Sequence, residues 1–443
     1  MTRRRQRLPQ EPIELEITDL SHDGRGIARH HDKVVFVQNA LPGEKVVAKL
    51  NRRTRHFDEA TATSIANQSN DRVAPACEFY DRCNGCSMMH VSDGKQIEFK
   101  FNTLKSNLEK MAELQPIQWL PHLSDRHWHY RRRARLSVKW VPGKDKVLVG
   151  FREKNGRFVA DMDYCLVLEK PLAALIKPLQ ELVMKMAIKT FIPQVECALS
   201  DHQPALIMRH MRPVPEADKI LLLEFAQHHD IQLFLQSKGP DTVTPIQPDY
   251  NALSFDLPQQ ALSYEFLPND FIQVNQNMNE KMIEQVLSVM DLSSEAKVLD
   301  LFCGLGNFSL PMARHSQQVI GVEGDQQLVQ RARHNATLNK LNNVDFFTAD
   351  LTKEHSQSAW FQQDFSHVLI DPPRSGAWEV LPLIAKTSAD TLVYVSCHPA
   401  SLARDSKCLV QEFGFEMQSA GVMDMFPHTS HVESMAVFKR TKP

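Results

Sequence analysis

The residues best suited to covalent chemistry lie near the C-terminal end of the chain. Cys397 stands in the polar turn 396–399, of sequence S-C-H-P, directly after an apolar run. A thiolate there can add to C6 of a pyrimidine ring, which makes C5 nucleophilic enough to accept a methyl group. A base must then remove the C5 proton. Glu433 opens the last apolar stretch of the chain and is our first candidate for this base, ahead of His428 and His431.

A second pattern, farther upstream, suits a nucleoside ligand. The predicted strand 297–301 ends in the glycine-rich turn F-C-G-L-G-N, Glu323 ends the next predicted strand, and Asp350 ends the third. Glycines let the backbone approach a ligand closely. An acidic side chain at a strand end suits the paired hydroxyls of a ribose. The order D-x-F-x-G-x-G…E…D resembles the class I S-adenosylmethionine-dependent methyltransferases. A Rossmann dehydrogenase that binds a dinucleotide is the alternative.

Four cysteines form a candidate metal site. Cys77, Cys83 and Cys86 follow the spacing C-x5-C-x2-C, and Cys165 comes later in the chain. Four thiolates suit either a tetrahedral zinc ion or a [4Fe–4S] cluster, and the spacing alone does not separate the two. The spacing differs from the C-x3-C-x2-C of radical S-adenosylmethionine enzymes. Eight cysteines in 443 residues are too sparse for a secreted scaffold built on disulfides.

Alternating helices and strands must position the first two patterns. The periodicity predicts helices over 279–290 and 326–341, and strands over 297–301, 318–323, 344–348, 367–370 and 391–396. This alternation indicates a parallel, doubly wound α/β sheet, in which ligands bind at the carboxyl ends of the strands. Cys397, Glu323 and Asp350 all fall at such ends. In the mixed α and β region before this sheet, we expect helices over 172–192 and 219–230.

The N-terminal part has a different pattern. Residues 11–66 contain several short β stretches separated by the turn signals D-G-R-G and L-P-G-E. Short strands in such a small region indicate a β-barrel of the OB type, which is a common RNA-binding module. A barrel that only packs on its neighbours is the alternative.

The net charge of −2 hides an uneven distribution of charge. Residues 126–157 carry eleven Lys or Arg and two acidic residues, whereas residues 268–443 carry fourteen basic and twenty acidic ones. In the basic stretch aromatic residues alternate with arginines, which suits contact with phosphates and stacking on unpaired bases. We therefore expect this stretch to face RNA.

Two features predict where the protein resides. No apolar run approaches the roughly 18 residues that a membrane helix needs. The first ten residues are rich in arginine and have neither the apolar core nor the cleavage site of a secretory signal. We expect a cytoplasmic protein with no membrane partner.

Several motifs together resemble the RNA uridine-C5 methyltransferase family. They are F-I-Q-V-N-Q at 271–276, D-L-F-C-G-L-G-N-F at 300–308, D-P-P-R at 371–374, S-C-H-P-A-S-L-A-R-D at 396–405 and H-V-E-S-M at 431–435. The resemblance covers the whole catalytic domain in order. It implies that Cys397 is the nucleophile and that Glu433 is the proton acceptor.

The same resemblance implies a set of cofactor residues. The residues that it implies to bind S-adenosylmethionine or to line its pocket are Gln273, Phe302, Asn307, Glu323, Asp350 and Asp371. It also implies that Asp371 hydrogen-bonds the uracil and that Phe271 packs on it. His398 departs from the pattern, since many members have asparagine there. We expect the histidine to shift the local hydrogen bonding without removing the activity.

The cysteine spacing resembles one branch of this family, the bacterial 23S ribosomal RNA uracil-5-methyltransferases. This implies that Cys77, Cys83, Cys86 and Cys165 hold a [4Fe–4S] cluster. We favour a mainly structural and RNA-positioning role for it, with redox sensing as the alternative. It also implies that the barrel is of the TRAM type. The tRNA-modifying relatives generally lack both features.

The sequence thus predicts a three-part enzyme that forms 5-methyluridine in 23S ribosomal RNA. Its parts are a TRAM-like barrel over 10–68, an α+β iron–sulfur domain over 74–267, and a class I, Rossmann-like methyltransferase domain over 268–443. We expect a monomer that acts on single-stranded or loop RNA with the target uridine flipped out. The alternatives are the same chemistry on tRNA, methylation of cytosine C5 in RNA, and a non-catalytic iron–sulfur RNA-binding factor.

Overall fold

The computed structural model describes residues 11–154 and 156–441. These residues form two compact units. Unit 1 contains residues 11–103 and the short segment 426–431, and unit 2 contains the remaining described residues. No helix in the described chain has both the length and the apolar character that crossing a membrane requires.

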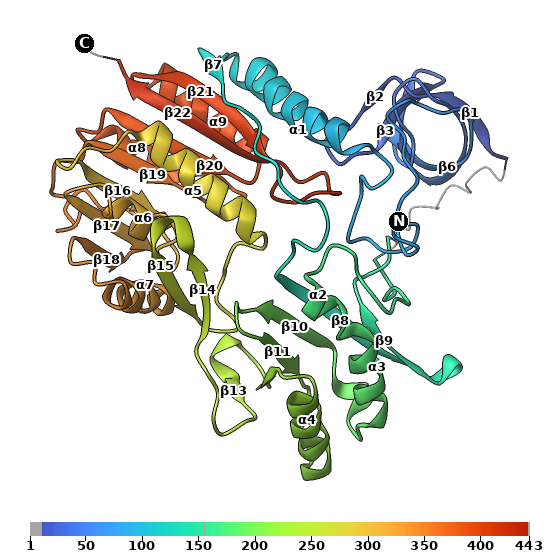
Figure 1. The fold of residues 1–443 in the computed structure, drawn as a ribbon. Helices are drawn as coiled ribbons and strands as arrows, with labels where there is room; N and C mark the ends of the chain where they lie inside the picture. The colour runs from blue at the N-terminus through green and yellow to red at the C-terminus, as the bar shows by residue number, and fades with distance from the viewer. Residues whose placement is uncertain (1–10, 155, 442–443) are drawn as a thin grey trace, which may run out of the picture. The chain divides into compact units, whose positions relative to one another are not determined.

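Unit 1 begins with a barrel of short strands (Figure 1). The strands follow the order β1-β5-β6-β4-β3-β2. Their bounds are β1 (Ile13–Glu16), β2 (Asp19–Leu20), β3 (Gly26–His30), β4 (Lys33–Gln38), β5 (Lys45–Arg53) and β6 (Phe57–Asn67). Alternate residues of β4 and β5 point inward, so Val35, Val37, Val46 and Ala48 form part of a buried core. This period of two is the pattern expected of strands with one buried face.

The rest of unit 1 joins two segments that are far apart in the sequence. A loop that holds three of the cysteines leads into α1 (Asp93–Asn107). The backbone N–H groups of Ser87 and Met88 donate to the carbonyl of His428 at 3.0 and 2.9 Å, and the N–H of His428 donates to the Gln96 side chain at 2.8 Å. The segment 426–431 is therefore a structural part of the cysteine-containing unit.

Unit 2 begins with a mixed sheet in the order β13-β12-β11-β10-β8-β9. Its strands are β8 (Arg133–Val141), β9 (Lys146–Gly150), β10 (Gln194–Leu199), β11 (Pro204–Arg209), β12 (Gln232–Gln236) and β13 (Val243–Pro245). The helices of this region are α2 (Lys170–Ala173), α3 (Ile176–Lys185) and α4 (Glu216–His228). A separate hairpin consists of β14 (Leu253–Leu257) and β15 (Leu262–Phe266).

The second sheet of unit 2 has eight strands in the order β18-β17-β16-β19-β20-β22-β21-β7. They are β7 (Gln118–Trp119), β16 (Lys297–Leu301), β17 (Gln318–Glu323), β18 (Val344–Thr348), β19 (His367–Ile370), β20 (Thr391–Ser396), β21 (Phe415–Met423) and β22 (Glu433–Arg440). The α-helices between them are α5 (Gln276–Met290), α6 (Ser309–Ala313), α7 (Gln326–Leu338), α8 (Leu381–Ala385) and α9 (Pro399–Gln411). Shorter helical segments of the described chain are η1 (Leu108–Ala112), η2 (Pro142–Lys144), η3 (Lys189–Phe191), η4 (Pro240–Thr242), η5 (Pro258–Gln260) and η6 (Trp378–Val380).

The strand order of this second sheet determines where a ligand can bind. The strands from β18 to β20 pair in parallel. The central strands β16, β19 and β20 are almost entirely buried, as in a sheet whose two faces are both covered. From β16 the chain first builds outward through β17 and β18, then returns to add β19 and β20 on the other side. Such a switch point leaves a crevice at the carboxyl ends of the strands. The antiparallel strand β22, between β20 and β21, departs from the all-parallel sheet of a dinucleotide-binding dehydrogenase.

Candidate active site

The turn after β16 folds back onto the neighbouring strand β17. The N–H groups of Phe302 and Cys303 donate to the carbonyl of Val322 at 2.9 and 3.2 Å. The N–H of Gly304 donates to the Glu323 carboxylate at 3.1 Å. Phe302 has a φ of +64°, in the left-handed region, so the turn is sharp at its first residue. The two features that the sequence assigned to the cofactor, the turn and Glu323, are thus joined directly.

Asp350 lies beyond the end of β18 and is exposed. Its carboxylate accepts hydrogen bonds from the N–H and hydroxyl of Thr352 at 3.1 and 2.6 Å, and it pairs with Lys353 at 3.1 Å. These donors lower the pKa of Asp350 to about 2. Asp350 is therefore an ionised acceptor at the strand end, the chemistry that an exocyclic amino group requires.

Asp300 is a functional candidate to which the sequence analysis gave no role. It is fully buried in β16, and burial raises its pKa to about 8. One carboxylate oxygen accepts from the hydroxyl of Ser309. Within the described chain the other oxygen is buried and has no hydrogen-bond partner. An unsatisfied carboxylate oxygen directly before the glycine turn fits a site that receives a donor group from a ligand or an ordered water. The signal in the sequence was a lone acid inside an apolar strand.

The remaining cofactor candidates lie at the start of α5 and in the turn. Asn307 exchanges two hydrogen bonds with Asn279 of α5, at 2.8 and 2.9 Å. Gln273 is half-buried in the segment before this helix. The next residue but one, Asn275, is fully buried and caps the helix by accepting from the N–H of Met278. These contacts fix the turn and the segment 271–275 to the same helix.

The two residues proposed for covalent chemistry lie on adjacent antiparallel strands. Ser396 at the end of β20 pairs with Ser434 near the start of β22. Cys397 directly follows Ser396, and Glu433 directly precedes Ser434. The end of this strand pair therefore brings the two side chains near each other, and the Glu433 carboxylate acts on the Cys397 thiol. Both side chains are half-buried.

The electrostatic surroundings of Cys397 agree with this arrangement. Burial and the nearby carboxylates of Glu433 and Asp371 raise the pKa of the Cys397 thiol to about 11, whereas Arg374 acts in the opposite direction. Asp371 follows β19, and burial raises its pKa to about 7. A carboxyl group with such a pKa can either accept or donate a hydrogen bond near neutral pH. The structure thus brings a thiol and two carboxyl groups together beside the cofactor turn.

His398 has a defined structural role next to the nucleophile. Its Nδ1 accepts from the N–H of Ser401 at 3.3 Å, so its side chain caps the N-terminus of α9. Asparagine is among the strongest helix N-caps. The histidine therefore supplies the same kind of cap as the asparagine common in the family. The two weaker base candidates, His428 and His431, belong to the segment 426–431 of unit 1.

The candidate metal ligands divide between the two units. Cys77, Cys83 and Cys86 lie in unit 1, and the buried Cys165 lies in unit 2. The N–H of Gly85 donates to the sulfur of Cys83 at 3.3 Å, which suits a thiolate ligand. All eight cysteines are described, and none forms a disulfide. No group of three or more His, Cys, Asp or Glu side chains in the described chain is arranged to hold a metal ion. The iron–sulfur cluster stays a prediction.

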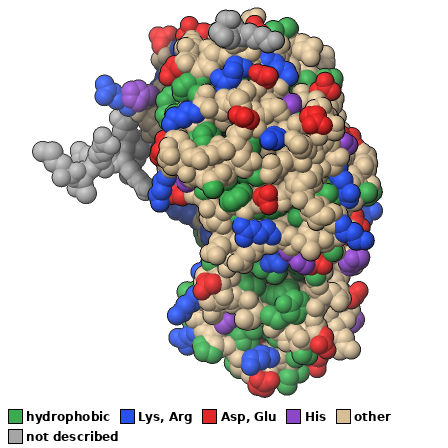
Figure 2. All heavy atoms as spheres, turned by 90° about the vertical axis from the view of Figure 1, so that its left-hand side faces the viewer, with side chains coloured by type: hydrophobic (Ala, Val, Ile, Leu, Met, Phe, Trp, Pro, Cys, Tyr) green, Lys and Arg blue, Asp and Glu red, His purple; other side chains and the backbone are tan. Residues whose placement is uncertain are grey.

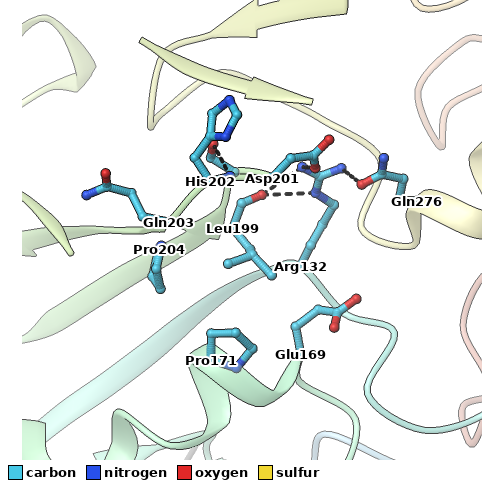
Figure 3. A pocket seen from close by; sticks show the side chains of 10 residues that line it. Arg132, Glu169, Pro171, Leu199, Asp201, His202, Gln203, Pro204 and Gln276 are labelled. Carbon is cyan, nitrogen blue, oxygen red and sulfur yellow. Dashed lines mark hydrogen bonds and ion pairs between the residues drawn. The ribbon is translucent and has the colours of Figure 1, made fainter. Parts of the chain in front are cut away.

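The basic stretch 126–157 is less exposed than its charge suggests. Arg132 is buried, and its guanidinium bonds to the carbonyl of Leu199 and to the side chains of Gln276 and Asp201 (Figure 3). Around it lies a polar pocket of about 250 Å³. The next residue, Arg133, opens β8 and donates to the carbonyl of Asn269 at 3.0 Å. The expectation that the whole stretch faces RNA is wrong for Arg132, because its buried guanidinium is committed to partners inside the protein.

Comparisons with known proteins identify the family of this chain. A model of the TRAM domain matches residues 6–63. A model described as tRNA (Uracil-5-)-methyltransferase matches residues 93–441. A protein of Xanthomonas campestris pv. campestris (strain 8004), named 23S rRNA (uracil(1939)-C(5))-methyltransferase RlmD, is 48% identical over 99% of this chain and 100% of its own length. A protein of Stenotrophomonas maltophilia (strain R551-3) with the same name is 46% identical over the same shares.

A solved structure shares the fold over nearly the whole chain. It is that of Pyrococcus abyssi tRNA (uracil-54, C5)-methyltransferase in complex with S-adenosyl-L-homocysteine, with a TM-score of 0.74 and 22% identity. The match covers 96% of this chain and 100% of that one. The predicted methyltransferase fold with an N-terminal TRAM domain is confirmed, and the dehydrogenase alternative is wrong. The chain belongs to the tRNA (uracil-5-)-methyltransferase family, whose members are S-adenosylmethionine-dependent RNA uracil-C5 methyltransferases.

Proposed function

We propose that this enzyme methylates C5 of a uridine in 23S ribosomal RNA, the substrate named for its full-length relatives. The observation that carries the chemistry is the nearness of Cys397, directly after β20, to Glu433, at the start of β22, together with the effect of the Glu433 carboxylate on the thiol. Neither methylation of an exocyclic nitrogen nor simple RNA binding needs a thiol and a base placed together in this way.

The reaction follows from these two side chains. The Cys397 thiolate forms a bond to C6 of the uracil, and the electrons of the C5–C6 double bond move to make C5 enolate-like. S-adenosylmethionine supplies an electrophilic methyl group to C5 when bound. The Glu433 carboxylate then takes the proton from C5, the double bond re-forms, and the thiolate leaves C6. Atoms balance, since the ring gains a methyl group and loses the C5 proton.

We assign the surrounding residues by their chemistry. The residues proposed to bind S-adenosylmethionine or to line its pocket are Gln273, Phe302, Asn307, Glu323, Asp350 and Asp371. The ionised Asp350 suits the adenine amino group, and Glu323 suits the ribose hydroxyls. Asp371, whose pKa lies near 7, can also hydrogen-bond the uracil. Phe271 is 64% exposed, which leaves its ring available to pack on a base.

We further propose that Cys77, Cys83, Cys86 and Cys165 hold a [4Fe–4S] cluster. The support is the set of four thiols, one of which already accepts a backbone N–H hydrogen bond of the kind that surrounds ligated sulfur. The domain limits that we propose are 10–68 for the barrel, 74–267 for the iron–sulfur domain and 268–443 for the catalytic domain. We propose a cytoplasmic monomer that binds its uridine flipped out of single-stranded or loop RNA.

The decisive experiment supplies purified enzyme with S-adenosylmethionine labelled in its methyl group, together with either 23S ribosomal RNA or tRNA. We expect label only in the ribosomal RNA, on C5 of one uridine, with the position found by nuclease mapping. Label in tRNA, or on cytosine, would establish one of the alternative substrates. Tight RNA binding without any transferred label would instead establish a non-catalytic RNA-binding factor.

A further inference from the structure

A buried carboxylate that has no part in the proposed reaction joins three elements of the site. Asp405 lies on α9 and is fully buried. One of its oxygens accepts from the N–H of Ala377 at 2.7 Å and from the hydroxyl of Tyr394 at 2.8 Å. The other accepts from Nε of Arg404 at 2.8 Å. The acceptor oxygens of one side chain therefore tie a loop, strand β20 and its own helix together.

The loop that it holds is 371–377, which begins with Asp371 and carries Arg374. Other residues of α9 add contacts, since Arg404 donates to the carbonyl of Ser375 at 2.8 Å and Ser401 donates to that of Arg374 at 3.2 Å. Gly376 packs directly on the carboxylate. Its φ is +87°, and a Cβ there would lie 2.5 Å from an oxygen of Asp405. The loop is thus fitted closely to the helix that follows the nucleophile.

We infer that Asp405 is a positioning residue, which holds the 371–377 loop against α9 and so sets where Asp371 and Arg374 lie beside Cys397. The inference rests on the proposed nucleophilic role of Cys397. Both loop charges act on the thiol, and the upward effect of Asp371 on its pKa exceeds the downward effect of Arg374. Releasing the loop should therefore change the acidity of the thiol as well as the rate of the reaction.

The test compares Asp405→Ala, Asp405→Asn and Gly376→Ala in the full-length enzyme. Ser406→Ala is the matched control, because Ser406 is equally buried on the same helix and its hydroxyl has no hydrogen-bond partner within the described chain. For each variant the measurements are kcat on RNA, the thermal midpoint, and the rate at which iodoacetamide alkylates Cys397 as a function of pH. Cys397→Ala gives the background alkylation of the other cysteines.

We expect Asp405→Ala and Gly376→Ala to lower kcat by about 10- to 100-fold, as misplaced groups do, and to move the thiol titration to lower pH. Asp405→Asn keeps an oxygen for the N–H of Ala377 and should fall between these variants and wild type. Wild-type kcat and titration in the folded variants would overturn the inference, and so would behaviour equal to that of Ser406→Ala. If Asp405→Ala does not fold, the kcat and the thiol titration of Asp405→Asn and Gly376→Ala test the inference in its place. Activity retained by Cys397→Ala would instead overturn the proposed function.

Discussion

The groups around Cys397 have opposing effects on the pKa of its thiol. Burial and two carboxylates favour the neutral thiol, whereas Arg374 and the N-terminus of α9, which begins two residues later, favour the thiolate. The carboxylates and burial dominate in the free enzyme, since the pKa of the thiol is raised to about 11. Near neutral pH the resting enzyme therefore holds Cys397 mainly as the less reactive thiol, which limits its oxidation.

A raised pKa has a measurable consequence for the pH dependence of the thiol. Below a pKa of about 11 the thiolate fraction rises about tenfold for each pH unit. We expect the rate of alkylation of Cys397 by iodoacetamide, in enzyme without RNA, to rise steadily from pH 7 to pH 10. A rate that levels off by about pH 9.5, one unit above the ordinary thiol pKa of about 8.5, would contradict the environment described above.

The nucleophile itself is tested with RNA that contains 5-fluorouridine at the target. The fluorine leaves no C5 proton to remove, so the covalent adduct cannot resolve. We expect wild-type enzyme and S-adenosylmethionine to form a protein–RNA complex that survives denaturing gel electrophoresis, and Cys397→Ala to form none. Cys408→Ala, which changes a buried cysteine on α9, is the control and should form the adduct normally. An adduct with Cys397→Ala would rule out this nucleophile.

Changing Glu433 to Gln should have two separate effects. Because the amide cannot take the C5 proton, an adduct should accumulate on ordinary uridine, and turnover should fall by about 100-fold or more. Because a negative charge beside the thiol is lost, the pKa of Cys397 should fall and alkylation at pH 8 should become faster. Rapid turnover by this variant would remove Glu433 from the role of base, whatever the alkylation result.

At the scale of elements, the turn between β16 and α6 shows how backbone conformation fixes the cofactor site. Gly306 has a φ of +92°, and an added Cβ would lie 3.2 Å from Leu310 and 3.3 Å from Phe346. Gly304 has a φ of +57° and open space around it. Gly306 is therefore needed for both the backbone conformation and the packing, whereas Gly304 is needed only for the backbone conformation.

This difference predicts the ranking of two substitutions. Gly304→Ala should lower the free energy of unfolding by roughly 1–2 kcal/mol, the cost of a left-handed conformation for an L-residue. Gly306→Ala should cost more, because Leu310 and Phe346 must also move. Chemical denaturation without cofactor measures both values, and calorimetry then measures S-adenosylmethionine binding. Equal stability losses would show that the packing around Gly306 adapts freely.

Predicting elements from the sequence succeeded where the periodicity was simple. All five predicted parallel strands of the catalytic sheet match β16 to β20. The predicted helix over 326–341 ends earlier, at Leu338, because Lys340 turns into the left-handed region with a φ of +56°. The helix predicted over 172–192 is wrong as a single element, since it divides into α2, α3 and η3. Apolar residues recur at helical spacing across both breaks, so the pattern does not mark where one helix ends and the next begins.

At the scale of the whole molecule, charge is a poor guide to the RNA surface. The exposed side chain of Arg135 pairs with Glu196 at 3.0 Å, and Lys146 pairs with Asp161 at 2.5 Å. Figure 2 shows basic and acidic side chains interspersed over one face of the molecule. Much of the local excess charge of 126–157 is thus balanced by acids that are distant in sequence. Specific RNA contact must depend on a few exposed groups rather than on net charge.

The proposed iron–sulfur cluster draws its four cysteines from both units of the chain. We expect enzyme purified without oxygen to be brown, with broad visible absorption and about four iron atoms per chain. Cys83→Ser should lose both iron and colour, whereas Cys197→Ser, which changes a buried cysteine outside the proposed set, should keep them. A colourless protein that contains one zinc ion would replace the iron–sulfur cluster with the zinc site that the spacing equally allows.

The sequence by itself determined the catalytic fold, the cofactor turn and the identity of the residues proposed for catalysis, because these depend on local periodicity and on short motifs. Only the tertiary structure brought Cys397 and Glu433 close together, because their neighbours Ser396 and Ser434, 38 residues apart in the sequence, pair across β20 and β22. It alone showed that Arg132 is buried, that Asp300 has an unsatisfied oxygen, and that Asp405 holds the 371–377 loop. Burial and hydrogen-bond partners are properties of packing between distant segments, so no local pattern contains them.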